Sequence, residues 1–318
     1  MRFRTCTARA PCSTANLGPG YDVFGLALDA LEDRVTITAT ESHRGLKISI
    51  AGLAGEISTD PEQNSAGLVV ARMASDAGLE RTGFDLEINK GVPAGYGMGS
   101  SGASSAAAAV AFDHLLQLGV ERNKLVEYAA AGEIASAGAA HYDNVSASLL
   151  GGFVISRLSG PSTPEFVRFE PPHGLRLVVA VPRVAVPKRK TEVARSVLPK
   201  EVSLEKLVHN VSSASTIVAG FSKGDVEMIA RGVDDVIVEP ARKGLISGYD
   251  DVRRMALDAG ALAVTISGAG PSLISILKGR DKEAQVAQAM EQGFKRSGIE
   301  SKTFACGPSK GSEILSAR

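Results

Sequence analysis

Residues 93–103 read Pro93-Ala94-Gly95-Tyr96-Gly97-Met98-Gly99-Ser100-Ser101-Gly102-Ala103. They follow the alternating segment 84–89 (FDLEIN), which predicts a strand, and they open the Ala-rich segment 104–118, which predicts a helix. Glycine lets backbone amides face a ligand without a side chain in the way, and the first turn of a helix adds unpaired N–H groups and a positive dipole end. The stretch therefore predicts a phosphate-binding loop. The simpler alternative is a glycine-rich turn in which a serine caps the helix.

Other nucleotide motifs fit this chain less well. Gly97, Gly99 and Gly102 match the dinucleotide pattern G-x-G-x-x-G, which requires a strand ending in an acidic residue about 20 positions later. The corresponding residues, 119–123 (GVERN), lie between two predicted helices. A nicotinamide dehydrogenase is therefore disfavoured. The chain also has no G-x-x-x-x-G-K-[ST] stretch and no H-R-D or D-F-G signature, which excludes the ordinary P-loop and the protein kinases.

Composition narrows the class of protein further. Lys and Arg total 35, and Asp and Glu also total 35, so the formal net charge is zero. This balance argues against nucleic-acid and membrane-surface binders, which usually carry a basic excess. No apolar run approaches the roughly 20 residues that span a bilayer, and the first ten residues lack the apolar core of a signal peptide. Cys6, Cys12 and Cys306 have no C-x-x-C spacing and predict neither disulfides nor a zinc site, so we expect a soluble cytoplasmic protein.

The 318 residues favour two domains. Alternating or apolar segments predict strands at 35–40, 46–50, 84–89, 153–158, 175–181, 261–267, 272–278 and 301–306, and helices are expected at 104–118, 124–137, 204–221 and 282–295. The Pro-rich stretch 161–172 predicts two short polar turns and a domain boundary at about residue 172, giving domains 1–172 and 173–318. In the second domain the order of strand, helix, two strands, helix and strand resembles a ferredoxin-like arrangement.

Two more polar, turn-rich loops stand out: residues 10–22 (APCSTANLGPGYD) and residues 267–272 (SGAGPS). Each could be a plain turn by itself. Together with residues 93–103 they resemble the three signature motifs of the GHMP kinases, named for galactokinase and for homoserine, mevalonate and phosphomevalonate kinases. Residues 11–28 (PCSTANLGPGYDVFGLAL) are most similar to the homoserine kinase branch, whose signature has the form P-A-T-S-A-N-L-G-P-G-F-D. Cys12, Tyr21, Met98 and Gly102 replace the usual Ala, Phe, Leu and Ala, and none of these changes removes a polar functional group.

The resemblance covers the whole chain and implies an α+β fold of two domains. The first would be a ribosomal-protein-like α+β domain with a left-handed βαβ crossover, and the second a ferredoxin-like α/β sandwich. It also implies ATP as co-substrate, bound through residues 93–103, with Asn64 and Lys90 near the adenine. Mg²⁺ would be held by the Glu133 carboxylate and the Ser101 hydroxyl. By residue type alone, Glu133 could equally be a solvated charge on a helix.

For the acceptor, the resemblance implies L-homoserine, phosphorylated on its side-chain hydroxyl to O-phospho-L-homoserine as a step of threonine biosynthesis. The pocket would include the residues Asn16, Asp22, His141, Asn144, Thr191, Arg195 and Arg242. Two spacings are compatible with this: His141 and Asn144 share a face if 140–149 is helical, and Thr191 and Arg195 are four apart. An arginine fork matches a carboxylate, although a single arginine is more often a surface residue and a single histidine more often structural.

The expected mechanism relies on electrostatic stabilisation of the transferred phosphoryl group. The Asn144 amide cannot take a proton at neutral pH, so a general base is not expected at that position. Asp22 would orient the acceptor hydroxyl, and its action as a weak base is the open alternative. Homodimers are usual in the family. Two other functions stay open: a GHMP kinase with a different acceptor, and a ligand-binding regulator of the same fold without turnover.

Overall fold

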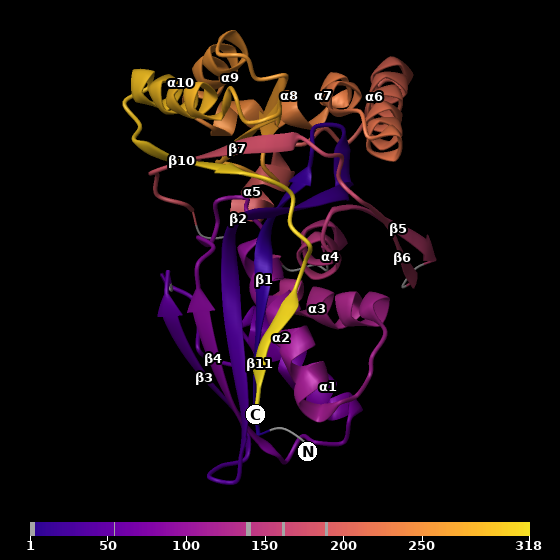
Figure 1. Ribbon diagram of the computed structural model, residues 1–318, viewed down its shortest axis with the longest axis vertical. Helices are drawn as coiled ribbons and strands as arrows, with labels where there is room; N and C mark the ends of the chain where they lie inside the picture. Colours follow the sequence, from indigo (N-terminus) through magenta and orange to yellow (C-terminus); the bar gives the residue numbers. More distant parts are fainter. Residues whose placement is uncertain (1–3, 54, 138–140, 161–162, 188–189) are drawn as a thin grey trace.

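The computed structural model describes residues 4–53, 55–137, 141–160, 163–187 and 190–318. Two β-sheets, stacked one above the other in Figure 1, organise these residues. The strands are β1 (Thr5–Asn16), β2 (Gly20–Thr40), β3 (Gly45–Gly52), β4 (Gly83–Lys90), β5 (Phe153–Gly160), β6 (Thr163–Phe169), β7 (Leu175–Pro182), β8 (Ala263–Ile266), β9 (Leu273–Lys278), β10 (Ser301–Cys306) and β11 (Glu313–Ala317). The helices are α1 (Ser65–Asp76), α2 (Ser100–Leu116), α3 (Arg122–Ala137), α4 (Tyr142–Leu150), α5 (Lys190–Ser196), α6 (Leu204–Lys223), α7 (Val226–Gly232), α8 (Val238–Arg242), α9 (Tyr249–Asp258) and α10 (Glu283–Arg296), with a short 3₁₀ turn at Lys243–Leu245.

The first sheet has the order β11-β1-β2-β4-β3, and β5 adds the β5–β6 hairpin to the N-terminal half of β2. Its pairings are antiparallel except between β3 and β4, which are parallel and are connected by α1. A parallel pair needs such a crossover, so β3, α1 and β4 form the expected βαβ unit. The hand of its crossover stays a prediction.

Helix α2 is the central element of the lower half. Its sequence, SSGASSAAAAVAFDHLL, is almost all small residues, and 13 of its 17 residues are buried. A helix that is apolar all round is stable only when it is covered on every side. It packs on β1 and β2 and is covered by α1, α3 and α4, as Figure 1 shows. The glycine-rich loop enters this helix, so the loop has a rigid, buried support.

The second sheet has the order β10-β7-β9-β8, and all its pairings are antiparallel. In chain order this is 4-1-3-2 with helices between the first and second strands and between the third and fourth, which is the ferredoxin-like pattern. Helix α10 packs on β7 and β10, and α9 packs on α10 and β8. The predicted α+β fold, with a ferredoxin-like second half, is confirmed.

Three predicted elements differ from the structure. The strand expected at 35–40 is only the end of β2. The first half of β2 contains two glycines and a continuous run of buried residues, so its sequence lacks the alternation by which a strand is predicted. The stretch expected to form two polar turns contains β6, because residues 163–169 alternate between more and less exposed positions and pair with β5 as an edge strand. The strand at 301–306 is not the last, since β11 returns to pair with β1.

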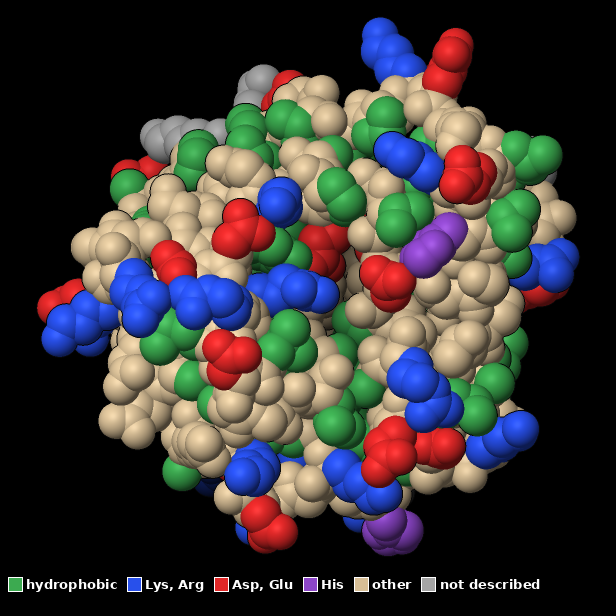
Figure 2. All heavy atoms as spheres, turned by 90° about the horizontal axis from the view of Figure 1, so that it is seen from above, with side chains coloured by type: hydrophobic (Ala, Val, Ile, Leu, Met, Phe, Trp, Pro, Cys, Tyr) green, Lys and Arg blue, Asp and Glu red, His purple; other side chains and the backbone are tan. Residues whose placement is uncertain are grey.

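The domain boundary near residue 172 lies between β6 and β7 and stays a prediction, since β11 belongs to the first sheet although it follows the second. Among the described residues, no helix combines the length and the apolar character that crossing a membrane requires. Seen from above, basic and acidic side chains both occur across the surface of the upper half (Figure 2). The three cysteines are buried free thiols.

Candidate active site

Three loops that are distant in sequence meet where the two sheets face each other. The first loop, residues 10–22, is the turn at residues 17–19 together with the end of β1 and the start of β2. The glycine-rich loop, residues 93–103, runs into the start of α2, and the third loop, residues 267–272, joins β8 to β9. The Ser13 amide donates to the Met98 carbonyl at 3.1 Å, and the Ser267 hydroxyl donates to the Gly97 carbonyl at 2.7 Å. These bonds hold the glycine-rich loop between the other two loops, so the three predicted motifs form one site.

Two glycines of this loop are required by the geometry. Gly97 has a φ of +77°, and a Cβ there would lie 2.1 Å from the Ser267 carbonyl oxygen. Gly99 has a φ of +64°, and a Cβ there would lie 2.0 Å from the Ser13 hydroxyl. Because other residues rarely adopt this backbone conformation and a side chain has no room, glycine is needed at both positions.

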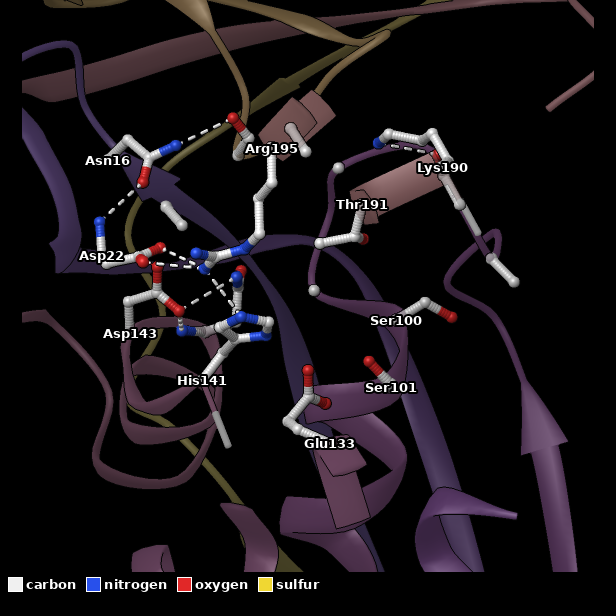
Figure 3. Close-up of a pocket in the computed structure, with 18 of the residues that line it drawn as sticks. Asn16, Asp22, Ser100, Ser101, Glu133, His141, Asp143, Lys190, Thr191 and Arg195 are labelled. Atoms are coloured by element: carbon white, nitrogen blue, oxygen red, sulfur yellow. Dashed lines mark hydrogen bonds and ion pairs between the residues drawn. The ribbon is translucent and has the colours of Figure 1, made fainter. Parts of the chain in front are cut away.

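The loops enclose a cavity of about 280 Å³. The predicted site residues that line it are Asn16, Asp22, Ala94, Gly95, Gly97, Gly99, Ser100, Ser101, Glu133, His141, Asn144, Thr191, Arg195 and Arg242. Those that do not line it are Asn64, Lys90, Pro93, Tyr96, Met98, Gly102 and Ala103. Side chains from both halves of the chain therefore reach one cavity, and Figure 3 shows how they face each other across it.

Asn64 and Lys90 have structural partners instead. Asn64 is the N-cap of α1: its side chain accepts from the Gly67 amide at 3.1 Å and donates to a backbone carbonyl of the preceding turn. The buried Lys90 ammonium forms an ion pair with the buried Asp33 carboxylate and donates to the Ser100 carbonyl at 2.9 Å. Their predicted place near the adenine is untested, but both side chains are already engaged in holding α1 and the start of α2.

Glu133 and Ser101 face each other at one side of the cavity (Figure 3). Gly132 makes this possible, because a Cβ at that position would lie 2.4 Å from the Ser105 hydroxyl of α2 and 2.5 Å from the Ser65 carbonyl of α1. The close contact of the three helices buries Glu133. Burial raises the pKa of Glu133 to about 7, and a hydrogen bond with Ser101 opposes this rise. A bound cation would favour the ionised form.

Mg²⁺ is compatible with this donor set. Among the described residues, no group of three or more His, Cys, Asp or Glu side chains could hold a metal by itself. Mg²⁺ usually takes one or two carboxylates and completes its octahedron with substrate phosphates and water. One buried carboxylate and one hydroxyl beside a phosphate-binding loop satisfy that requirement.

On the opposite side of the cavity, Arg195 connects two predicted pocket residues. Its Nη2 donates to both carboxylate oxygens of Asp22, at 2.9 and 2.7 Å, and to the His141 Nε2 at 2.7 Å. The imidazole therefore accepts at Nε2, and burial together with the neighbouring Arg195 lowers the pKa of His141. His141 does not share a helix face with Asn144 as expected, because it is the extended N-cap residue of α4 and only Asn144 is helical.

Arg242 is the second arginine of this side. It is buried, and its Nε and Nη1 donate to the carbonyls of Ala194, at 3.0 Å, and Gly268, at 3.3 Å. The Tyr21 ring lies under both guanidinium groups, 5.0 Å from that of Arg242 and 5.5 Å from that of Arg195. The ring and the carbonyls keep the two cations in place at the cavity wall.

Asn16 and Asp22 shape the end of the first loop. Asn16 donates to the Gly268 carbonyl at 2.8 Å, and its side-chain oxygen accepts from the Asp22 amide at 3.2 Å. Both residues have positive φ, 73° and 57°, which is uncommon for residues other than glycine and recurs at functional sites. The strained backbone directs the Asp22 carboxylate toward Arg195.

Sequence reasoning missed two charged residues of the cavity, Asp143 and Lys190. Asp143 is buried beside Asn144, whose backbone amide donates to its carboxylate at 2.7 Å, and burial raises the pKa of Asp143 to about 6. An acid directly between His141 and Asn144 was a usable signal. Lys190 belongs to a run of basic residues that resembles an exposed surface segment, so no comparable signal pointed to it.

Comparison with known proteins identifies the same family that the three loops resemble. The family model described as GHMP kinases N terminal domain matches residues 64–152, and the one described as GHMP kinases C terminal matches residues 217–296. The chain is 39% identical over 290 residues to homoserine kinase of Thermoplasma volcanium, covering 91% of this chain and 90% of the relative. It is 44% identical over 285 residues to homoserine kinase of Methanopyrus kandleri, covering 89% and 90%. The chain belongs to the homoserine kinase family of GHMP kinases.

The crystal structure of homoserine kinase from Cytophaga hutchinsonii matches with a TM-score of 0.91 and 35% identity over 98% of both chains. The resemblance first seen in residues 11–28 is thereby confirmed. Membership of the GHMP kinases makes the chain a phosphotransferase, with ATP as its co-substrate.

Proposed function

We propose that this kinase transfers the γ-phosphoryl group of ATP to the side-chain hydroxyl of L-homoserine, forming O-phospho-L-homoserine and ADP. The observation that carries the proposal is the charge pattern of the cavity wall. Two cations, Arg195 and Arg242, lie beside two carboxylates, Asp22 and Asp143. A free amino acid is a zwitterion, so a pocket with both charges suits it better than it suits a sugar or a simple hydroxy acid.

Each end of the zwitterion has a suitable partner. Arg242 is fixed by two carbonyls and offers its remaining N–H groups to a carboxylate. Asp143 is buried next to the cavity, and an ammonium group beside it would favour its ionised form. Asn16, His141, Thr191 and Arg195 complete the proposed acceptor pocket. The acceptor hydroxyl would then point toward the glycine-rich loop.

In the transfer, the bond between the γ-phosphorus and the β–γ bridging oxygen breaks and a bond to the homoserine oxygen forms. The hydroxyl proton leaves to the transferred phosphoryl group, since the Asn144 side chain cannot accept it: its oxygen accepts from the Ser13 hydroxyl at 2.9 Å and its NH₂ donates to Asp143 at 3.3 Å. Asp22 orients the hydroxyl. Glu133 and Ser101 would hold Mg²⁺, which when bound neutralises charge on the terminal phosphates.

The deciding experiment is a coupled ADP-release assay with homoserine, mevalonate, galactose, shikimate and a control without acceptor. Homoserine should give the highest kcat/KM by at least two orders of magnitude. A different preferred acceptor would make the chain another GHMP kinase, and ADP release equal to that of the control with every acceptor would favour a binding protein without turnover.

The carboxylate contact is tested with homoserinol, which keeps the amine and the hydroxyl but lacks the carboxylate. Losing a charged hydrogen-bonding partner costs on the order of 2 kcal/mol, about thirtyfold in kcat/KM. If homoserinol reacts as well as homoserine, the arginines do not hold the carboxylate.

We also propose that the enzyme is a cytoplasmic homodimer. Leu204, Leu207, Val208 and Val211 form an exposed apolar stripe along α6, with the i, i+3, i+4, i+7 spacing of one helix face. Such a stripe commonly packs on another protein surface. Light scattering on the purified protein should give twice the monomer mass, and Val208→Glu should give the monomer. A monomeric parent enzyme would remove this part of the proposal.

A further inference from the structure

Lys190, the first residue of α5, connects two of the three loops at the active site. Its ammonium group donates to the Gly95 carbonyl of the glycine-rich loop at 3.0 Å and to the Gly270 carbonyl of the third loop. The same side chain lines the cavity together with Gly95, Gly97 and Gly99. In Figure 3 it lies on the side of Ser100, across the cavity from Asp22 and Asp143.

The charge of this lysine is not balanced by a carboxylate of the described residues. Its two hydrogen-bond partners are neutral carbonyls, and the charged group that affects it is another cation, Arg242. The Asp22 carboxylate is bound to Arg195, and Asp143 is bound to the amide of its neighbour. Burial and the field of Arg242 lower the pKa of Lys190 to about 7. An anion bound next to Lys190 would stabilise the charged form of its ammonium group.

The position of Lys190 indicates which anion this is. The acceptor residues Asp22, Asp143 and Arg195 lie on the other side of the cavity in Figure 3. Lys190 instead contacts the loop whose glycines and helix start are suited to phosphate. A lysine ammonium is a compact charge with three donors, which suits several oxygens of a phosphate chain.

We propose that Lys190 is a catalytic residue that binds the terminal phosphates of ATP and stabilises the negative charge of the γ-phosphoryl group during transfer. This inference rests on the proposed function. Lys190 forms no covalent bond and donates no proton. It exchanges at least one carbonyl for a phosphate oxygen when ATP binds, while the γ-phosphorus changes its bond from the bridging oxygen to the acceptor oxygen.

The main alternative is a purely structural link, in which Lys190 only connects the two loops. Lys190→Gln separates the two roles, because the glutamine NH₂ can still donate to a loop carbonyl but carries no charge. Lys190→Arg keeps the charge. Lys278→Gln is the matched control, since Lys278 is an exposed lysine that pairs with Glu227 on the surface. Thermal unfolding of each purified full-length variant is measured first, followed by steady-state kinetics and calorimetric titration with AMP-PNP or AMP in the presence of Mg²⁺.

If Lys190 binds the terminal phosphates, Lys190→Gln lowers kcat by about 10²-fold, in the range for loss of one donor to a reacting group. Its affinity for AMP-PNP falls by about thirtyfold, as for a charged hydrogen bond, whereas its affinity for AMP stays within about twofold. Lys190→Arg recovers at least part of the activity. Equal losses for AMP-PNP and AMP, or a Lys190→Gln variant as active as the parent, would overturn the proposal.

A second measurement needs no variant. The wild-type protein is labelled with acetic anhydride in the presence of AMP-PNP or AMP, and lysine acetylation is quantified by peptide mass spectrometry. AMP-PNP should protect Lys190 and AMP should not, with Lys278 equally labelled in both. Equal labelling of Lys190 would refute the phosphate contact. If these results support the contact but homoserine is not phosphorylated, the assignment of the acceptor fails while that of Lys190 stands.

Discussion

Replacing Glu133 by glutamine should make the metal-free protein more stable and strongly lower the activity of the enzyme. Glu133 is buried, and its pKa is raised from 4.5 to about 7. Because the folded-state pKa is the higher one, the folded protein holds the proton more tightly, and stability falls as pH rises from about 4.5 to about 7. A difference of one pKa unit corresponds to about 1.4 kcal/mol, so ionisation of Glu133 lowers the free energy of unfolding by up to about 3 kcal/mol at pH 8. Glutamine has a similar shape and no such cost.

The assay is thermal unfolding in EDTA at several pH values. At pH 8, Glu133→Gln should have an unfolding temperature about 4 °C above that of the parent, since the unfolding entropy is about 2 cal/mol/K per residue. The difference in unfolding free energy should shrink to about 1 kcal/mol at pH 5, where the parent carboxyl is protonated in the folded state. Glu127→Gln is the control on the same helix: its carboxylate pairs with Lys124 at the surface, so a small effect is expected. A stability gain that does not change with pH would refute the reasoning.

The same variant should lose at least about 10²-fold in kcat at ordinary Mg²⁺, because the amide is a much poorer ligand for this ion. Excess Mn²⁺ should recover a part of the activity if metal affinity is what was lost. Full activity of Glu133→Gln would remove this residue from the metal site even if the stability result is as expected.

Four further changes test other parts of the site. Arg242→Ala should raise the KM for homoserine by about thirtyfold and leave homoserinol turnover nearly unchanged, as steady-state kinetics with both acceptors will show. Because burial raises the pKa of Asp143 to about 6, the KM for homoserine should rise as pH falls from 7.5 to 5.5, and Asp143→Asn should have a high KM without this dependence. Gly97→Ala should abolish calorimetric ATP binding, since a Cβ would lie 2.1 Å from a carbonyl oxygen. Lys90→Met leaves the Asp33 carboxylate buried without its cation and should cost about 3–5 kcal/mol in urea unfolding, part of which Asp33→Asn in the same chain should restore.

The parts of the site that sequence could predict are those with a local chemical signature. Gly97 and Gly99 are needed for the backbone itself, so their pattern is visible without any tertiary information. Lys190 has no such signature, because one lysine in a basic run is an ordinary surface feature, and the signal for Asp143 was only its position between His141 and Asn144. Asp143 acquires its environment only when α4 packs near residues 10–22, more than a hundred residues away in sequence. Lys190 acquires its environment when it contacts Gly95 and Gly270, which are 95 and 80 residues away. Long-range packing of this kind is not encoded in short windows.

The same limit applies to the fold. Helix α2 could be predicted because its Ala-rich run of small residues indicates a helix over several successive turns. Strand β11 is short, and the 5-residue segment EILSA has little alternation. Its pairing with β1 depends on a contact across about 300 residues, as in Cys6 with Ala317.

That pairing makes the two halves of the chain dependent on each other for folding. The amides of Arg4 and Thr5 donate to the Arg318 carbonyl, and the start of β1 lies beside the end of β11 in the lower half of the molecule (Figure 1). During synthesis, the first sheet cannot complete its edge until the second sheet has been made. A fragment of residues 1–172 would therefore expose the hydrogen-bonding groups of β1 along a free edge, which is a known template for aggregation. Supplying a peptide with the sequence of β11 should keep such a fragment in solution.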